Sequence, residues 1–116
     1  MLKETGNSAR PRTPRAYDPV PALKALGHPL RFSLFELLAD GEKCVCDLVE
    51  AMDASQPLVS HHLSVLKKAR LIRDRHDATW VYYSVDLKNW KEFQGAMGSI
   101  RPSPAISVPC PTEGGL

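Results

Sequence analysis

The sequence lacks the features that mark a membrane or secreted protein. No apolar run approaches the roughly 20 residues that a membrane-spanning helix needs. The first residues, "MLKETGNSARPRTPR", contain no apolar core segment of the kind found in a signal peptide. We therefore expect a cytoplasmic protein with no membrane partner.

Cysteine is scarce, with three residues in a chain of 116: Cys44, Cys46 and Cys110. This small, odd number does not make a disulfide scaffold, so we expect free thiols that bind a metal or undergo redox chemistry. The sequence also has no glycine-rich phosphate loop and no Ser-His-Asp arrangement, and a CxC pair is poorly spaced for thiol exchange. It therefore predicts no enzyme, no catalytic residues and no constitutive cofactor.

Composition and proline content predict one small domain between two tails. The chain has 43% hydrophobic residues and a formal net charge of +2. Residues 1–17 are polar, basic and broken by proline, and we expect a flexible tail that either solubilises the protein or touches DNA phosphates. Residues 101–116 hold four prolines and should form a second flexible tail, which carries Cys110. Residues 18–100 would then form the folded domain.

Apolar spacing predicts helices within "PVPALKALG", "HPLRFSLFELLADG", "CVCDLVEAM" and "QPLVSHHLSVLKKARL". Gly27 and Gly41 suit the ends of the first two helices, and Ser55 is a suitable N-cap for the fourth. The period then changes to two in "LIRDRHDATWVYYSV", which predicts a β-hairpin with its turn around "RHDAT".

A last helix is predicted within "DLKNWKEFQGAM". Trp90, Phe93 and Met97 share one stripe of this helix, which is large enough to serve as a dimer contact. The order of elements is that of a winged helix-turn-helix. We therefore predict a mainly α, dimeric fold with a β-hairpin wing, in which residues 18–100 form the DNA-binding and dimerisation domain.

In that fold the helix beginning near Gln56 would be the recognition helix, with Val59, Leu63 and Leu66 facing the core. Polar groups near its start would contact base edges, and cations further along it and on the wing would contact phosphates or the minor groove. His62, at the edge of the buried stripe, is either a packed histidine that donates one hydrogen bond or a phosphate contact. The predicted DNA-binding residues are Ser55, Gln56, Ser60, His61, Ser64, Lys67, Lys68, Arg73 and Arg75.

The segments "CVCDL", "SQPLVSHHL" and "WVYYSV" are the most specific parts of a similarity that runs from Ala22 to Met97. Over this span the sequence resembles the ArsR/SmtB family of metal-responsive transcriptional repressors, and most of all its arsenic repressors. The resemblance implies a homodimer that binds a palindromic operator when metal-free and releases it when loaded. It also implies that Cys44 and Cys46 are ligands of the inducer, trivalent arsenic or antimony.

The residue types suit that chemistry, because thiolates prefer soft ions. We expect Cys44 and Cys46 in the first turn of their helix, where the helix dipole would lower the thiol pKa. Residues two apart in a regular helix point about 200° away from each other. Joint binding would then distort this turn and disturb the recognition helix packed against it.

Trivalent arsenic binds three sulfurs. The arsenic repressors have their third cysteine at the position that Val49 occupies in this sequence. Cys110 is therefore the candidate third ligand, from the same or the partner subunit. Without it, a two-thiol site would favour a monomethylated trivalent arsenical such as methylarsenite. Three alternatives stay open: a sensor of cadmium or lead, a sensor of thiol oxidation, and a winged helix that senses no ligand.

Overall fold

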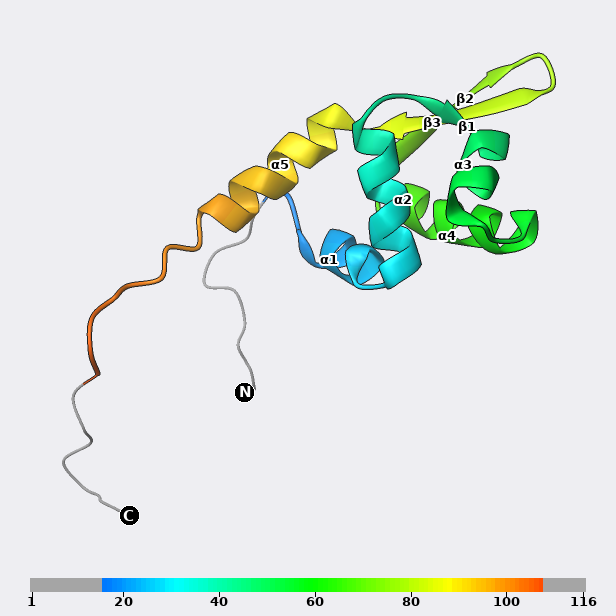
Figure 1. The fold of residues 1–116 in the computed structure, drawn as a ribbon. Helices are drawn as coiled ribbons and strands as arrows, with labels where there is room; N and C mark the ends of the chain where they lie inside the picture. Colours follow the sequence, from blue (N-terminus) through cyan, green and yellow to red (C-terminus); the bar gives the residue numbers. More distant parts are fainter. Residues whose placement is uncertain (1–15, 108–116) are drawn as a thin grey trace, which may run out of the picture.

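The computed structural model of the chain describes residues 16–107. Residues 1–15 and 108–116, which include Cys110 and most of the two predicted tails, lie outside this range. The described residues form five helices and three strands (Figure 1). In chain order these are α1 (Val20–Leu26), α2 (Pro29–Ala39), β1 (Lys43–Cys44), α3 (Val45–Met52), α4 (Gln56–Lys68), β2 (Ile72–Asp77), β3 (Trp80–Val85) and α5 (Leu87–Gly98). None of these helices is long and apolar enough to cross a bilayer.

Side-chain caps fix the starts of three helices. His28, Ser55 and Asp86 each accept a hydrogen bond from a backbone N–H two or three residues ahead, at 3.1 to 3.3 Å. Beyond the end of α2, Gly41 has a φ of 144°, which an L side chain rarely adopts. The ends of α1 and α2 predicted from Gly27 and Gly41, and the start of α4 predicted from Ser55, are thus confirmed, whereas the predicted start of α3 is not.

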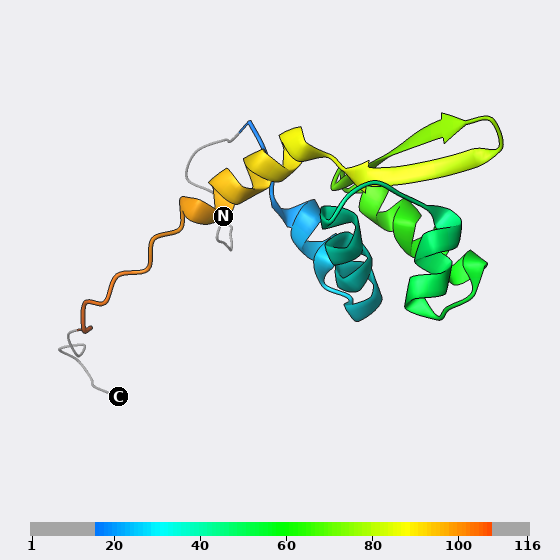
Figure 2. The same ribbon diagram turned by 45° about the horizontal axis from the view of Figure 1, so that its top comes forward.

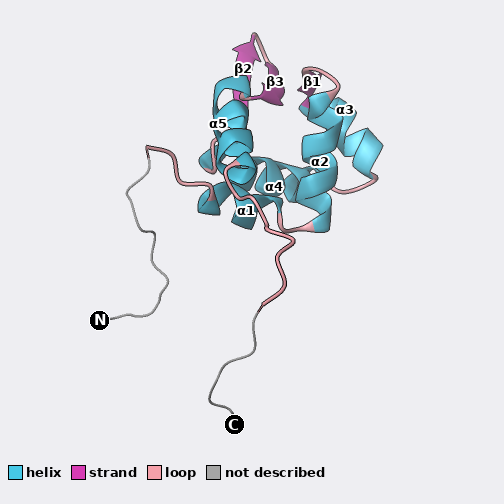
Figure 3. Cartoon of the chain, turned by 90° about the vertical axis from the view of Figure 1, so that its left-hand side faces the viewer, coloured by secondary structure: helices cyan, strands magenta, loops and turns pink. Residues whose placement is uncertain are grey.

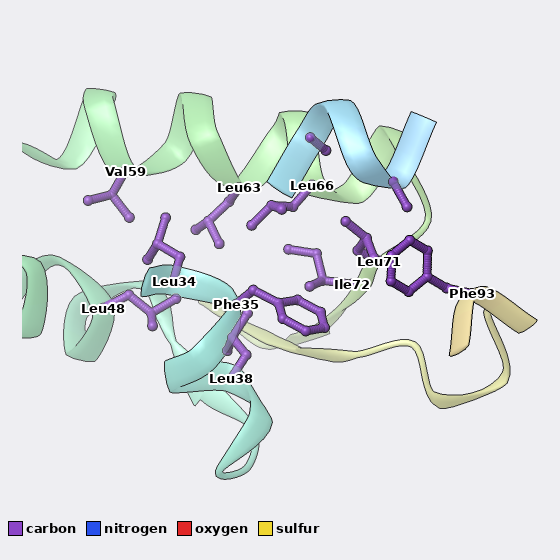
Figure 4. Close-up of a cluster of buried hydrophobic side chains, with 12 residues drawn as sticks. Leu34, Phe35, Leu38, Leu48, Val59, Leu63, Leu66, Leu71, Ile72 and Phe93 are labelled. Carbon is purple, nitrogen blue, oxygen red and sulfur yellow. The ribbon is translucent and has the colours of Figure 1, made fainter. Parts of the chain in front are cut away.

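One cluster of buried apolar side chains joins the five helices to the sheet (Figure 4). Helix α4 is at its centre, because α1, α2, α3 and β2 all pack against it. The large members, by element, are Leu34, Phe35 and Leu38 of α2, Leu48 of α3, Val59, Leu63 and Leu66 of α4, Leu71 and Ile72 at the start of the hairpin, and Phe93 of α5. The predicted stripe of α4 is therefore confirmed.

The stripe of α5 also packs on this core. Phe93 is buried and stacks on Trp90 with ring centroids 5.3 Å apart, and Trp90 lies 5.0 Å from Phe35. Leu87, the first residue of α5, and Ile100, two residues after its end, remain 67% and 64% exposed. Most of the predicted dimer stripe therefore serves the chain's own core, and apolar surface remains at its ends.

The strands form an antiparallel sheet in the order β1-β3-β2, at one end of the helices (Figure 3). The β2–β3 hairpin projects beyond α3 and α4 as a wing (Figure 2). The predicted turn around "RHDAT" is wrong in extent, because pairing continues to Asp77 and Trp80 and leaves Ala78 and Thr79 as the turn. The winged helix-turn-helix fold itself is confirmed.

Strand β1 has no counterpart in the sequence prediction. Lys43 pairs with Tyr83 and Cys44 with Tyr82, so the segment before α3 is joined to the wing. A strand of two residues shows no period in the sequence, and its partner lies far along the chain. As a result α3 begins at Val45, one residue later than predicted.

Candidate thiol site and DNA-facing surface

Cys44 and Cys46 lie together where β1 meets α3. Cys44 is the N-cap of α3, with an extended backbone (φ −82°, ψ 162°), and is buried with 9% of its surface exposed. Cys46 is the second residue of the helix and is exposed. The two sulfurs and a carboxylate oxygen of Asp47 all lie within 4.8 Å of one another. One metal ion could be coordinated by this group, which offers two soft sulfur donors and one hard oxygen donor.

This geometry corrects the expectation that both thiols belong to the first helical turn and point apart. Because pairing with β3 holds Cys44 in an extended conformation, the 200° helical offset does not apply to the pair. The thiols therefore converge without unwinding of α3.

The expected lowering of the thiol pKa is also wrong for Cys46. The hydrogen bond with the Cys44 thiol, partial desolvation and the nearby charges of Cys44 and Asp47 together raise the pKa of Cys46 above its usual value. A hydrogen bond with Asp47 backbone acts in the opposite direction without offsetting them. An ion that binds here would displace thiol protons.

Two residues are candidates for a third ligand, Cys110 and Asp47. Cys110 lies outside the described residues, and Val49 packs against the core from a half-buried position. Asp47 is not among the ligands predicted from the sequence, although the motif "CVCD" places it directly after the thiols. Within residues 16–107, Asp47 is the side chain that completes a group of three potential ligands.

The outer face of α4 is polar and accessible. Gln56, Ser60, His61, Ser64 and Lys68 are all exposed, as predicted, and Ser64 donates its hydroxyl to the carbonyl of His61 at 2.7 Å. Ser55 is exposed too, but its hydroxyl oxygen caps the helix by accepting the Leu58 N–H at 3.3 Å. The geometry of this face suits contact with base edges near its start.

The cations predicted to contact DNA differ in their present partners. Lys67 forms an ion pair with Asp74 of β2 at 2.8 Å, and this hydrogen bond raises the pKa of Lys67 and lowers that of Asp74. Lys68 and Arg73 are exposed and form no ion pair within the described residues. Neither side chain would therefore have to leave an ion pair of the described residues in order to meet phosphate.

Arg75 of β2 is held by two hydrogen bonds to Glu42, which lies just before β1. Its Nε donates to Oε2 at 3.0 Å and its Nη2 to Oε1 at 2.8 Å. The guanidinium also lies 4.5 Å from the ring centre of Tyr82. Hydrogen bonding to Arg75 lowers the pKa of Glu42. The wing is therefore tied to the thiol segment by an ion pair as well as by β1.

His62 is a packed histidine rather than a surface residue. It is 5% exposed, and its ring centre lies 4.5 Å from that of His28 and 5.2 Å from that of His61. Arg31 Nη1 lies 3.2 Å from His62 Nδ1, and because a guanidinium only donates, Nδ1 accepts. The predicted packing is confirmed, but the direction of the predicted hydrogen bond is reversed. Burial lowers the pKa of His62, and the charges of His28, Arg31 and His61 lower it further.

Comparison with known proteins identifies the same region of the chain. The pattern of the family described as bacterial regulatory protein, arsR family, matches residues 28–74. An uncharacterised HTH-type transcriptional regulator of Methanocaldococcus jannaschii is 45% identical over 65 residues, which cover 54% of this chain and 73% of that protein. The arsenical resistance operon repressor of Escherichia coli K12 is 42% identical over 66 residues, which cover 56% of each. The chain thus spans little more than half the length of that repressor.

Among solved structures, the homodimeric winged helix-turn-helix DNA-binding domain of a possible ArsR-family regulator from Mycobacterium bovis superposes with a TM-score of 0.59. It is 26% identical, and the match covers 69% of this chain and 75% of that one.

Proposed function

The chain belongs to the arsR family of bacterial regulatory proteins, and from that premise we propose that it is an arsenic(III)-responsive repressor that binds operator DNA as a homodimer. Membership of this family makes the chain a transcription regulator and not an enzyme. The observation that carries the arsenic proposal is the convergence of Cys44 and Cys46 at the start of α3. A relative named for arsenical resistance supports it.

The proposed ligand is As(III), or Sb(III), bound by the thiolates of Cys44 and Cys46. Both ions are soft and bind sulfur in preference to oxygen. Cys110 is proposed as the third sulfur for an inorganic ion, contributed by the same or the partner subunit. Because the two thiols already lie close enough to bind one ion, the entropic cost of ordering them on binding is reduced.

The proposed DNA contacts are those of the α4 face and the wing. Gln56, Ser60 and His61 would meet base edges, while Lys68 and Arg73 would meet phosphates, with Ser55, Ser64, Lys67 and Arg75 beside them. A homodimer would present two such surfaces to a palindromic operator. The exposed apolar residues Val20 and Leu23 of α1, with Leu87 and Ile100 at the ends of α5, support a subunit interface there.

Coupling between the two surfaces follows from how the thiols are anchored. Cys44 is paired with Tyr82 of the wing, while Cys46 belongs to α3, which packs directly on α4. An ion that draws the two sulfurs together would shift the wing relative to the recognition helix. Ligand and operator would then favour different arrangements of one element, which is the condition for allosteric release.

The test is fluorescence anisotropy of an operator fragment with wild type, Cys46→Ser and Cys110→Ser, each titrated with arsenite. Wild type should bind DNA and release it, whereas Cys46→Ser should bind with unchanged affinity and fail to release. A Cys110→Ser protein that still responds would remove the tail from the site. Normal release from Cys46→Ser would contradict the proposal as a whole.

The carboxylate of Asp47 supports a second candidate, a sensor of a divalent soft metal such as cadmium or lead. A site of two thiolates and one carboxylate suits such an ion better than As(III), which seeks a third sulfur. Asp47→Asn separates the two candidates. It should weaken release by Cd(II) if the carboxylate is a ligand, and leave release by arsenite unchanged.

A further inference from the structure

A hollow of about 280 Å³ opens beside the exposed thiol of Cys46. It lies between the start of α3, the first residue of α4 and the tip of the wing. The described residues that line it are Val45, Cys46, Gln56, Thr79, Trp80 and Val81. It is therefore the place in the described chain where the candidate ligand site, the recognition helix and the wing meet.

Trp80 makes this hollow unlike an ordinary surface depression. The side chain is 53% exposed, although tryptophan is among the residues with the most apolar surface to bury. It is the first residue of β3, opposite Asp77, where the turn of the hairpin holds it close to α3. With Val45 and Val81 it gives the hollow an apolar wall next to the thiol of Cys46.

The number of described thiols suggests what could occupy this space. Inorganic arsenite has three exchangeable hydroxyls, whereas an arsenical with one As–C bond has two. For the latter, R–As(OH)₂ and two cysteine thiols give R–As(S–Cys)₂ and two waters, with arsenic staying trivalent and the As–C bond intact. Cys44 and Cys46 then complete the coordination, and the group R remains to be accommodated.

We propose that the hollow is a subsite for the organic group of a monosubstituted trivalent arsenical, and that it makes the chain selective for such compounds over arsenite. The proposal rests on the thiol site proposed above and adds the class of ligand. An apolar cavity of about 150 Å³ is enough to hold a benzene molecule. A hollow of 280 Å³ therefore has room for an aryl group as well as for a methyl group.

The same placement gives the organic group a mechanical role. Gln56 begins the recognition helix and Trp80 begins the second strand of the wing, and both border the hollow. A group held between them would set the spacing of the two DNA-contacting elements. Bulkier substituents would thus be more effective inducers until they no longer fit.

The experiment uses the full chain free of DNA and follows the ultraviolet absorbance of arsenic–sulfur bonds during titration with arsenite, methylarsenite and phenylarsenite. Variants are Trp80→Ala, Trp80→Phe and, as a matched control, Phe32→Ala, an aromatic residue that is 48% exposed on α2 and does not line the hollow. Wild type should bind phenylarsenite most tightly and arsenite most weakly. Trp80→Ala should weaken phenylarsenite binding about tenfold, because apolar contact is lost, and leave arsenite unchanged. Trp80→Phe should retain most of the preference, and Phe32→Ala all of it.

The outcomes separate this proposal from the one on which it rests. Absence of arsenic–sulfur absorbance with all three compounds would overturn the thiol site itself. Binding of all three with equal affinity, or equal weakening of all three by Trp80→Ala, would overturn the subsite alone. If Trp80→Ala leaves the phenylarsenite-to-arsenite affinity ratio unchanged, the subsite is likewise excluded. A separate anisotropy titration of the same variant with an operator fragment then shows whether Trp80 is a DNA contact instead.

Discussion

Helices α3 and α4 begin close to each other, yet the two starts are held in different ways. At α4 the hydroxyl of Ser55 accepts a backbone N–H of the first turn, so the helix carries its own cap. At α3 the N-cap is Cys44, whose side chain makes no capping hydrogen bond. Its position depends on pairing with β3. Helix α4 is therefore fixed from within, whereas α3 is fixed from outside by the wing.

In the proposed function, this difference separates the DNA-reading element, α4, from the ligand-binding element, the start of α3. At α3 no N-cap side chain accepts the N–H groups of the first turn, so these groups stay available to other acceptors. A ligand bound there would change the start of α3 without breaking a cap, and α4 would keep its capped start. The comparison predicts unequal responses of the two helices to substitution, in stability and in DNA binding.

The largest difference is expected in the core. Leu63 of α4 and Leu48 of α3 both have 0% exposure. We expect Leu63→Ala to lower the free energy of unfolding by about 3–5 kcal/mol. Four elements pack against α4, so the cavity that this substitution creates cannot collapse. Leu48→Ala should lower it by about 2–3 kcal/mol, since the shorter α3 can shift inward. Urea unfolding at equal protein concentrations measures both, and an equal or reversed order would mean that α3 is as rigidly held as α4.

The second effect concerns His62, which ties the middle of α4 to Arg31 of α2. Because burial lowers the folded-state pKa of His62, the unfolded chain binds more protons as pH falls through 6.5. The free energy of unfolding should therefore decrease below that pH and level off above it. His62→Leu should remove this dependence while lowering stability at neutral pH by about 1–3 kcal/mol, since the Arg31 hydrogen bond loses its acceptor. Denaturant titrations across this range test the slope, and an unchanged slope in the variant would assign it to other groups.

A smaller effect is expected at the helix starts themselves. Ser55→Ala should destabilise the fold by about 1 kcal/mol, because the Leu58 N–H loses its partner. Cys46→Ala, in the first turn of α3, should change stability by less than about 0.5 kcal/mol, since the residue is exposed. Thermal and urea unfolding of the pair would show whether α3 is indeed held from outside. Equal losses would contradict that view.

The sequence predicted α4 well and the start of α3 poorly for the same physical reason. Helical period, proline at the first turn and a serine cap are local signals, so the element from Gln56 and its buried stripe were predictable. Strand β1 depends on pairing between Lys43 and Tyr83, which lie far apart in sequence, and two residues carry no period. Because β1 was not predicted, Cys44 was assigned to the helix, and the two thiols were expected to point apart. The ion pair between Glu42 and Arg75 could not be predicted for the same reason, because the two residues are 33 positions apart in the sequence.

The smallest effect tests the tie between the wing and the start of α3. Glu42 holds Arg75 through two hydrogen bonds, and both side chains are exposed enough for the pair to be weak. We expect Glu42→Gln to release Arg75 toward phosphate. Operator affinity of the metal-free protein should then rise a few-fold, and its dependence on salt should steepen by about one counterion. Anisotropy titrations over a range of salt concentrations measure both quantities.

Removing any acidic side chain raises affinity for DNA slightly, so a control is needed. Glu50→Gln makes the same change at an exposed position of α3 that forms no ion pair within the described residues. If the two variants raise affinity and salt dependence equally, the gain is a matter of net charge and Arg75 is not restrained by Glu42. If only Glu42→Gln steepens the salt dependence, the segment that carries the thiols also limits a DNA contact of the wing. The start of α3 would then govern operator binding through a side chain as well as through β1.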